Sequence, residues 1–365
     1  MTKRMLLAIL LLIVFALPAG CQKQGGEPTQ PTAPAPTILP THTPEPSPTP
    51  TPDPVGEALA GMTVEQKAAQ LLVAGIEGTE PGEDAVQAVQ GYQVGGVILF
   101  GRNVESAEQL AALTNGLKEL NGDYTPLFLC VDQEGGRVDR MPPEVTDLPS
   151  ALDFGSIADP EARMDACFTL GQTLAAQCAA FGFNMDFAPS LDIWSNPENT
   201  VIGDRAFGTD AATVTGAANE TALGILSGGV IPVAKHFPGH GDTAVDSHYG
   251  LPVVDKSLEE LEELELRPFR QAIDTTCVYG TYGGDTSIPA IMVAHILLSQ
   301  IDPDNPASLS PEVVTGLLRE EMGYEGVVCT DDLTMGAISN TYGMGEAAVL
   351  AVEAGCDLLL VCHGA

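Results

Sequence analysis

The chain has 365 residues, a formal net charge of −34 and a hydrophobic content of 44%. This length and apolar content suffice for one large domain, or two small ones, with a full core. So acidic a chain is unsuited to binding nucleic acid or anionic membrane surfaces. Its few cations include Arg137, Arg140, Arg205 and Lys235, all in the sequence blocks described below. Ion pairing on an acidic surface is the alternative explanation for them.

The first twenty residues have the pattern of an export signal. Lys3 and Arg4 precede an apolar run over residues 5–17, which is too short for a comfortable membrane span. Small residues followed by Cys21 resemble the lipobox of bacterial lipoproteins, although Pro18 lies where Leu is usual. We expect Cys21 to be diacylated and to anchor the chain at the extracellular face of a bacterial cell membrane, with plain secretion as the alternative.

Residues 21–55 are rich in Pro and Thr and carry almost no large apolar side chains. Such a segment cannot bury a core and favours extended polyproline II geometry. We therefore expect a disordered linker over 21–55 and a catalytic domain over 56–365.

Seven cysteines remain after Cys21, so a complete disulfide framework is impossible. Cys130, Cys329, Cys356 and Cys362 lie in apolar runs, where we expect them to be small buried side chains. No Cys-x-x-Cys pair is present, and no cysteine metal site is expected.

Residues 56–365 alternate apolar runs with helical patterns. The expected strands cover residues 71–76, 94–100, 127–132, 184–188, 230–236, 290–296, 326–331 and 356–362. These runs are continuously apolar, as in a parallel sheet covered on both faces. Eight strands alternating with helices predict an α/β fold, a (β/α)8 TIM-type barrel, with an open doubly wound sheet as the alternative.

Helix-start signals lie between the expected strands. Ser106 and Ser257 each have Gln or Glu three residues later, which is the capping-box spacing. Ser310 followed by Pro311 predicts an N-cap with proline at the first helical position, and Gly323 marks the end of that helix. The sequence stops just after the eighth expected strand, so we expect a barrel without its last helix, through truncation of a longer protein.

Titratable side chains gather where the expected strands end. In chain order these groups are Asp132–Arg140, Asp192 with the loop 199–208, Lys235–His248, His295, Asp331 with Asp332, and His363. The carboxyl ends of TIM-barrel strands share one face, and that face carries the catalytic residues. The sequence therefore predicts one site built from six strands.

Three of these blocks resemble glycoside hydrolase family 3, in its β-N-acetylhexosaminidase branch. They are Asp132-Gln-Glu-Gly-Gly-Arg-Val, Lys235-His-Phe-Pro-Gly-His-Gly with Asp246-Ser-His, and Thr330-Asp-Asp-Leu-Thr-Met. The resemblance covers residues 60–365 and implies a single barrel that needs no cofactor. It implies a carbohydrate partner, terminal β-linked N-acetylglucosamine in peptidoglycan fragments or chitooligosaccharides. A β-glucosidase-like activity on the same scaffold is the alternative.

The resemblance makes Asp331 the nucleophile of a retaining mechanism. Asp332 is the alternative nucleophile because it is the next residue. Successive side chains on a strand point to opposite faces, so only one of the two should face the cavity. Asp332 fits better as a cap of the next helix. In this branch the acid/base is a His held by an Asp, here His248 and Asp246. The carboxylate would fix one ring nitrogen and leave the other for the glycosidic oxygen.

The resemblance assigns sugar binding to Asp132, Arg140, Arg205, Lys235 and His236. A carboxylate accepts hydrogen bonds from sugar hydroxyls, and cations donate to hydroxyl or acetamido oxygens.

Four further residues in or near these blocks have other expected roles. We expect Arg137 to be structural and His240 to hold its loop. Met335 and Trp194 are candidates for apolar contact with the sugar, although a core role for Trp194 fits equally well.

Three other functions would use some of the same residues. His236, His240, Asp246 and His248 could ligate a metal, but Pro238-Gly239 breaks the helix that His-x3-His would need. Phosphorolysis is a stronger rival, because an imidazole acid/base would not repel incoming phosphate. A non-catalytic sugar-binding lipoprotein predicts the loss of Asp331 or His248, and both are present.

Overall fold

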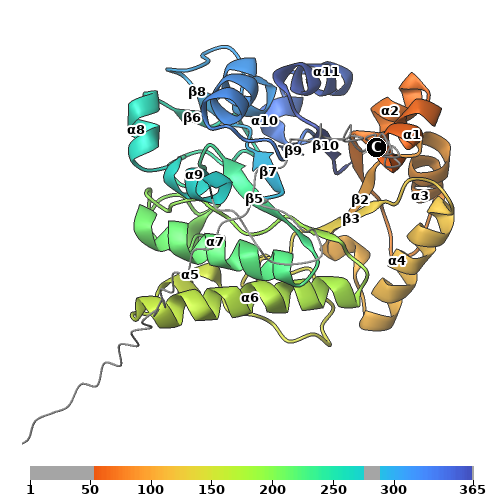
Figure 1. Cartoon of the computed structure of the whole chain (residues 1–365), viewed down its shortest axis with the longest axis horizontal. Coiled ribbons are helices and arrows are strands. Elements are labelled where there is room, and N and C mark those ends of the chain that lie inside the picture. The colour runs from red at the N-terminus through yellow and green to blue at the C-terminus, as the bar shows by residue number, and fades with distance from the viewer. Residues whose placement is uncertain (1–52, 275–287, 364–365) are drawn as a thin grey trace, which may run out of the picture. The chain divides into compact units, whose positions relative to one another are not determined.

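Eight parallel strands close into a barrel (Figure 1). Their order is β1, β10, β9, β7, β5, β4, β3, β2, and β1 pairs with both β10 and β2. The strands are β1 (Leu72–Gly75), β2 (Gly96–Leu99), β3 (Phe128–Val131), β4 (Met185–Asp186), β5 (Ile231–Phe237), β7 (Ala290–Val293), β9 (Val327–Asp332) and β10 (Leu358–Val361). Each overlaps one predicted run. The predicted (β/α)8 barrel is confirmed, and the doubly wound open sheet is wrong because the sheet has no edge.

The computed structural model describes residues 53–274 and 288–363. The predicted signal peptide, Cys21 and nearly all of the predicted linker lie outside these residues and stay predictions. The described chain ends two residues after β10, so the predicted absence of a last helix also stays a prediction. Within the described ranges, no helix is long and apolar enough to cross a membrane.

Helices and short helical turns connect the strands. The longer elements are α1 (Pro54–Gly61), α2 (Val64–Gln70), α4 (Ala107–Asn121), α6 (Pro160–Ala180), α7 (Ala211–Ser227), α8 (Leu258–Glu263), α9 (Arg267–Asp274) and α11 (Met344–Ala354). The other elements are α3 (Glu83–Val86), α5 (Ala151–Gly155), α10 (Gly336–Ser339), the 3-10 turns η2 (Gly101–Asn103), η3 (Gly203–Arg205) and η4 (Ala307–Leu309), and the π-helical η1 (Gln87–Tyr92) and η5 (Glu312–Glu321).

The predicted serine caps are present. Ser106 accepts a hydrogen bond from the backbone N–H of Gln109 at the start of α4. Ser257 forms a full capping box with Glu260 at the start of α8. Ser310 likewise accepts from the N–H of Val313, but the helix that follows, η5, is π-helical, a difference that local sequence signals do not encode.

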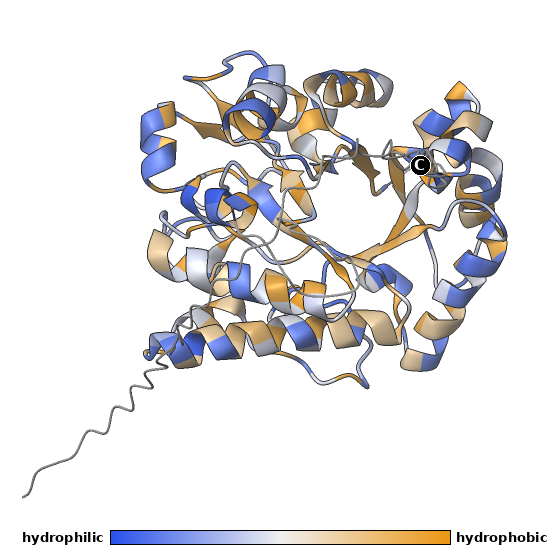
Figure 2. Cartoon of the chain, viewed as in Figure 1, coloured by the Kyte–Doolittle hydropathy of each residue, from blue (hydrophilic) through white to orange (hydrophobic). Residues whose placement is uncertain are grey.

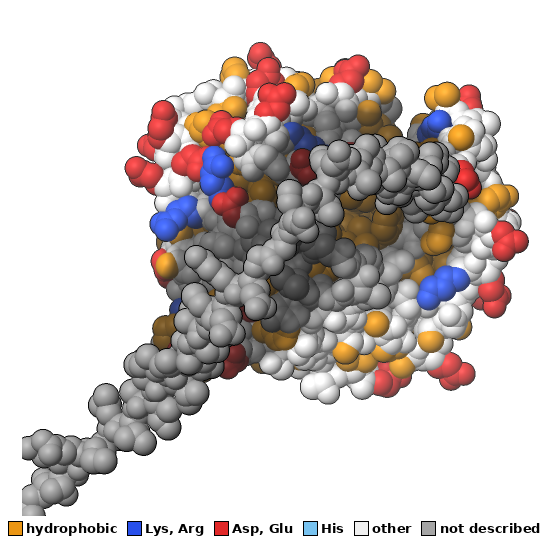
Figure 3. Space-filling view, in the orientation of Figure 1, with side chains coloured by type: hydrophobic (Ala, Val, Ile, Leu, Met, Phe, Trp, Pro, Cys, Tyr) orange, Lys and Arg blue, Asp and Glu red, His pale blue; other side chains and the backbone are white. Residues whose placement is uncertain are grey.

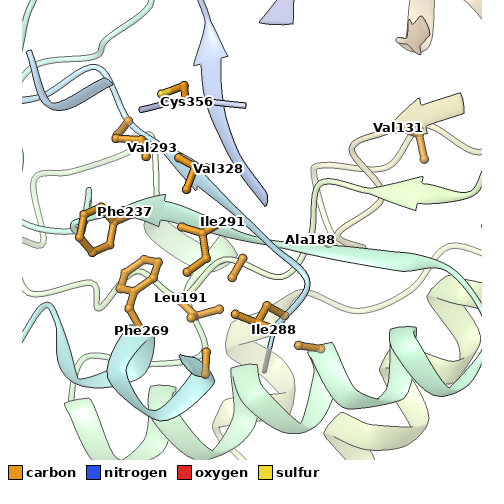
Figure 4. Packing of buried hydrophobic residues seen from close by; sticks show 14 of the residues in the cluster. Val131, Ala188, Leu191, Phe237, Phe269, Ile288, Ile291, Val293, Val328 and Cys356 are labelled. Carbon is orange, nitrogen blue, oxygen red and sulfur yellow. The ribbon is translucent and has the colours of Figure 1, made fainter. Parts of the chain in front are cut away.

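Buried apolar side chains form two layers, one on each side of the barrel wall. The inner layer takes at least one residue from each strand and consists of Val73, Ile98, Cys130, Met185, Phe187, Val233, Ala290, Met292, Cys329, Leu358, Leu360 and Cys362. The outer layer packs against the helices; in Figure 4 the ring of Phe237 meets that of Phe269 edge to face, with centroids 5.3 Å apart. Figure 2 shows the strands as almost continuously apolar ribbons, which both layers require.

Helices α6 and α7 cross very closely. A Cβ on Gly171 of α6 would lie 2.1 Å from the backbone oxygen of Thr221 in α7. A Cβ on Gly224 of α7 would lie 2.2 Å from the backbone oxygen of Phe168. Only glycine permits this approach at both positions. The contact fixes two of the helices that support β4 and β5.

A small second sheet lies beside the barrel. It consists of β6 (Val253–Val254) and β8 (Leu297–Leu298), which pair in parallel. Neither strand was predicted, because two-residue strands leave no periodic signal. The sheet ties the chain after the Lys235–His248 loop to the segment after β7.

The cysteine prediction is confirmed: Cys130, Cys329, Cys356 and Cys362 are all buried. The surface is acidic. On the face shown in Figure 3, carboxylate side chains far outnumber Lys and Arg. Lys235, by contrast, is only 1% exposed, so this cation belongs to the interior.

Candidate active site

A cavity of about 550 Å³ opens at the carboxyl ends of the barrel strands. All eight residues predicted for catalysis or sugar binding line it: Asp132, Arg140, Arg205, Lys235, His236, Asp246, His248 and Asp331. They come from the segments that follow β3, β4 and β5, and from β5 and β9 themselves. The structure therefore brings every predicted site residue within the described chain to one place.

A buried charge cluster forms one wall of this cavity. Lys235 Nζ lies 2.6 Å from Asp132 Oδ1 and 2.7 Å from Glu134 Oε1. Arg205 donates to both oxygens of Glu134, at 2.7 Å and 2.9 Å. Such charge-assisted pairs fix the direction of each side chain.

The charges in this cluster depend on one another. Burial alone would raise the pKa of Glu134, but Arg205 and Lys235 hold it well below its ordinary value. Burial would lower the pKa of Lys235, but Asp132 and Glu134 outweigh it and raise the pKa. Glu134, Arg205 and Lys235 are thus ionised at neutral pH, and the cluster presents oriented N–H donors and carboxylate acceptors to the cavity.

His236 is oriented by a buried carboxylate. Its Nδ1 lies 2.6 Å from Asp192 Oδ2, and Asp192 also accepts from the backbone N–H of His240 at 2.6 Å. Burial opposes ionisation of Asp192, yet the charges and N–H groups of His236 and His240 lower its pKa to about 2. With Nδ1 committed to this carboxylate, Nε2 of His236 faces Arg205, whose Nη2 lies 3.3 Å away and can only donate.

The two adjacent aspartates at the end of β9 differ in their bonding. Asp331 Oδ1 accepts the backbone N–H of Asp332 at 2.8 Å. Burial would raise the pKa of Asp331, but the imidazoles of His295 and His236 and that N–H outweigh it and lower the pKa. Asp331 is therefore an anion with oxygen capacity left for a ligand.

Asp332 holds the following turn. Its Oδ1 accepts from the N–H groups of Thr334 and Cys362, and its Oδ2 accepts the Thr334 hydroxyl. Both Asp331 and Asp332 nevertheless lie on the cavity wall. The prediction that only one of them faces the cavity is wrong, because the pairing of β9 with β10 shifts register between Cys329 and Asp332 and interrupts the alternation.

His248 and Asp246 form a hydrogen-bonded pair. Asp246 Oδ1 lies 2.8 Å from His248 Nδ1 and accepts the backbone N–H of His248 at 2.9 Å. Burial alone would raise the pKa of Asp246, but these hydrogen bonds outweigh it and lower the pKa. The imidazole side chain is 62% exposed, so its Nε2 is open to the cavity. This is the arrangement that an acid/base imidazole requires.

His240 holds the loop that carries this pair. Its Nδ1 lies 2.7 Å from Thr243 Oγ1, and its Nε2 lies 3.1 Å from Ser247 Oγ, one residue before His248. The imidazole is buried and does not line the cavity. Its contacts agree with the predicted structural role.

His240 makes stability depend on pH. Burial and the neighbouring His236 lower its pKa from 6.5 to about 4. Between those values the unfolded chain binds the proton and the folded protein does not, so stability rises with pH. We expect this residue alone to cost about 3 kcal/mol of unfolding free energy as pH falls from 7 to 4. Urea unfolding at pH 7, 5.5 and 4.5 measures it.

A His240→Gln variant is the control, because Gln keeps hydrogen-bonding capacity but does not titrate. Burial also lowers the pKa of His295, and this residue contributes in the same direction in both proteins. The difference between wild type and variant should therefore shrink as the pH falls. Parallel stability curves would show that His240 does not titrate on folding.

Two arginines from the Asp132–Arg140 block behave differently. Arg137 donates to Asp204 Oδ1 and to the backbone oxygens of residues 200, 201 and 202, so it clamps the loop that carries Arg205. Its predicted structural role agrees with these contacts. Among the described residues, no carboxylate lies within ion-pair distance of Arg140, whose guanidinium faces the cavity.

Three residues that matter to the site carried no assigned role in the sequence. Glu134 bridges Lys235 and Arg205; Asp192 orients His236; and His295, buried behind Asp331, bonds Ser308 Oγ and the backbone oxygen of Asp332. Glu134 lies two residues after Asp132, a same-side spacing that could have suggested it. Met335 lines the cavity, but Trp194 does not, so the candidate role of Trp194 in apolar contact with the sugar is wrong.

The metal alternative involves His236, His240, Asp246 and His248. Over the described ranges, no group of three or more His, Cys, Asp or Glu side chains is arranged to hold an ion. His236 and His240 bond Asp192, Thr243 and Ser247 instead.

Residues 63–365 match the glycosyl hydrolase family 3 N-terminal domain. The chain belongs to this family. It is 36% identical over 290 residues to a beta-hexosaminidase of Methylobacillus flagellatus, covering 79% of each chain. Curated beta-hexosaminidases of Nitrosomonas eutropha and Alkalilimnicola ehrlichii are each 38% identical to it. As a member of glycosyl hydrolase family 3, the chain is a glycosidase.

Solved structures of the family agree in fold. The β-N-acetylglucosaminidase from Paenibacillus sp. FPU-7 is 44% identical with a TM-score of 0.75, over 82% of this chain and 55% of that one. This chain thus spans about half the length of the Paenibacillus protein. NagZ from Neisseria gonorrhoeae in complex with N-trifluoroacetyl-D-glucosamine is 36% identical with a TM-score of 0.70, over 80% of this chain and 81% of that one.

Proposed function

We propose that this glycosidase is a retaining, exo-acting β-N-acetylglucosaminidase that acts on peptidoglycan fragments or chitooligosaccharides. One observation carries the proposal: Asp331 and the Asp246–His248 pair lie on the wall of the same cavity as the predicted sugar binders. The choice of sugar is supported by relatives named beta-hexosaminidase and by the NagZ complex with an N-acylated glucosamine.

In the first step, a carboxylate oxygen of Asp331 attacks the anomeric carbon while the bond to the leaving oxygen breaks. His248 is doubly protonated at this stage, with Nδ1–H donated to Asp246 and Nε2–H directed at that oxygen. The Nε2 proton moves to the leaving group, which departs as an alcohol. A glycosyl ester on Asp331 remains.

In the second step, water attacks the anomeric carbon from the side the leaving group vacated. His248, now neutral, takes a proton from this water through Nε2, and the ester bond to Asp331 breaks. N-acetylglucosamine leaves with its original anomeric configuration, and both residues regain their starting protonation.

The polar wall of the cavity holds the sugar for these steps. Asp132 supplies an acceptor for hydroxyl groups, and Lys235 and Arg205 supply donors held rigid by Glu134. His236 lies on the same wall. Arg140 has no described carboxylate partner; it donates one N–H to the backbone oxygen of Asp139 and adds further donors to the cavity wall. Met335, Met292 and Leu360 give an apolar wall suited to the ring face or the acetyl methyl group.

Phosphorolysis is the second candidate, and one observation favours it. The proposed acid/base is an imidazole rather than a carboxylate, so a phosphate dianion could approach the glycosyl ester without charge repulsion. The products then differ: water gives the free sugar, and phosphate gives the sugar 1-phosphate.

The purified full-length chain should hydrolyse 4-nitrophenyl β-N-acetylglucosaminide, and prefer it over the corresponding glucoside and xyloside by roughly 100-fold or more. Kinetics with the three glycosides measures the preference, and NMR of the first-formed anomer tests retention. Product analysis with and without phosphate separates the two candidates. Preference for the glucoside would overturn the choice of sugar in favour of a β-glucosidase-like activity.

A further inference from the structure

The loop that carries the Asp246–His248 pair is docked on α10, the short helix that follows the nucleophile strand β9 (Figure 1). The backbone N–H of Gly336 donates to the carbonyl of His248 at 3.1 Å, and the N–H of Ala337 donates to the carbonyl of Ser247 at 3.0 Å. Asn340 Nδ2 donates to the carbonyl of Tyr249 at 3.1 Å. Three successive loop carbonyls thus bind one helix.

These bonds are most of what fastens the loop. Residues 245–250 otherwise bond to one another, apart from the contact between Ser247 Oγ and His240 Nε2. Within the described chain, the loop's only hydrogen bonds to other segments are the three to Gly336, Ala337 and Asn340 and the one to His240. The side chain of Tyr249 is 82% exposed, so packing adds little there.

Gly336 leaves no room for a side chain. A Cβ at this position would lie 2.7 Å from the backbone oxygen of His248 and 3.0 Å from the carbonyl carbon and oxygen of Tyr249. All three atoms are backbone, so no rotamer change could relieve the overlap. Any larger residue would push the loop away from α10.

The start of α10 is itself fixed to the nucleophile strand. Asp332, next to Asp331, accepts the N–H of Thr334 and the N–H of Cys362, and the N–H of Met335 donates to the Asp332 carbonyl. This anchoring does not involve the loop. The loop of His248 is therefore fixed, through α10, relative to the strand that carries Asp331.

We propose that Gly336 and Asn340 are positioning residues that set the acid/base imidazole over the leaving-group side of the cavity. The inference rests on the proposed function, since it assigns these residues an effect on proton transfer alone. Neither residue lines the cavity, so sugar binding and nucleophilic attack should not depend on them directly.

The test compares Gly336→Ala with wild type on N-acetylglucosaminides whose leaving groups range from nitrophenol to a simple alcohol. We expect kcat/KM to fall roughly 10- to 100-fold for the alcohol and by less than about threefold for the nitrophenol, because a displaced acid matters most where protonation is needed. Gly345→Ala is the matched control: a Cβ there meets nothing within 4 Å, and it should behave as wild type.

The same substitution in a His248→Ala background separates positioning from general damage. If Gly336 acts only through His248, Gly336→Ala should change nothing further in that background. Additive losses, or equal losses across all leaving groups, would overturn the proposal. Should Gly336→Ala not fold, the exposed Asn340→Ala must show the same leaving-group pattern more weakly, and a flat pattern there refutes the inference.

Failure of the proposed function gives a different result. In that case the wild-type chain would not hydrolyse N-acetylglucosaminides, or His248→Ala would show no dependence on the leaving group. If instead the wild-type chain is active and the loss in His248→Ala depends on the leaving group, the proposed function stands. A Gly336→Ala variant that then matches wild type on every substrate would contradict only the positioning role of the docking contact.

Discussion

Asp331→Ala is expected to lower turnover of 4-nitrophenyl β-N-acetylglucosaminide by roughly four orders of magnitude or more. The variant loses the atom that would bond to the anomeric carbon, and no neighbour can replace it because Asp332 is committed to three hydrogen bonds. The fold should survive, since Asp331 accepts one local bond from the next residue. Initial rates and thermal midpoints measure both expectations.

Covalent trapping decides between the two aspartates. A fluorinated glycosyl donor that slows the second step should leave its sugar on the peptide containing Asp331, and mass spectrometry can locate the ester. Asp332→Asn is the control: it should lose stability first, because its side chain holds the turn after β9 and the N–H of Cys362. Label on Asp332, or near wild-type rates in Asp331→Ala, would remove the assignment.

The barrel was predictable because its signals are local. Each strand is a continuous apolar run, and Ser106 and Ser257 cap their helices through contacts within four residues. The exact strand ends were not predictable. The run over 184–188 yields only the two residues of β4, because pairing with β3 and β5 sets the limits.

The site was predictable to the level of which residues meet, and less so in how they are held. Strand-end clustering brings Asp132, Lys235 and Asp331 to one face, as the sequence indicates. The partner that bridges Lys235 to Arg205, which lie thirty residues apart, is Glu134, and that bridge depends on the barrel closing. Local signals carry no information about such a contact.

Sequence reasoning failed where it had to choose the direction of a side chain. Trp194 was a candidate for the cavity because it is the only tryptophan, but rarity does not fix orientation. The docking of the His248 loop on α10 was also invisible, because it uses backbone N–H groups. Only the absence of a side chain at Gly336 leaves a trace of it in the sequence.

His248→Ala is expected to lower kcat/KM by roughly 10²- to 10⁴-fold for substrates with poor leaving groups. An alkoxide is a strong base and departs only when protonated, whereas nitrophenolate leaves as a stable anion. The loss should therefore be smallest for nitrophenyl glycosides. A plot of log kcat/KM against leaving-group pKa should be steeper for the variant than for wild type.

Asp246→Asn is the matched control, because it keeps the imidazole and removes the charge that steadies it. It should show the same pattern with a smaller loss, and it should add little to His248→Ala because both act through one proton. If His248 were only a sugar contact, its removal would raise KM equally for every leaving group. The slope of that plot, rather than the size of the loss, therefore distinguishes an acid from a binding residue. Because the imidazole of His248 is exposed, bonded to a carboxylate and on the same cavity wall as Asp331, we expect its removal to change that slope.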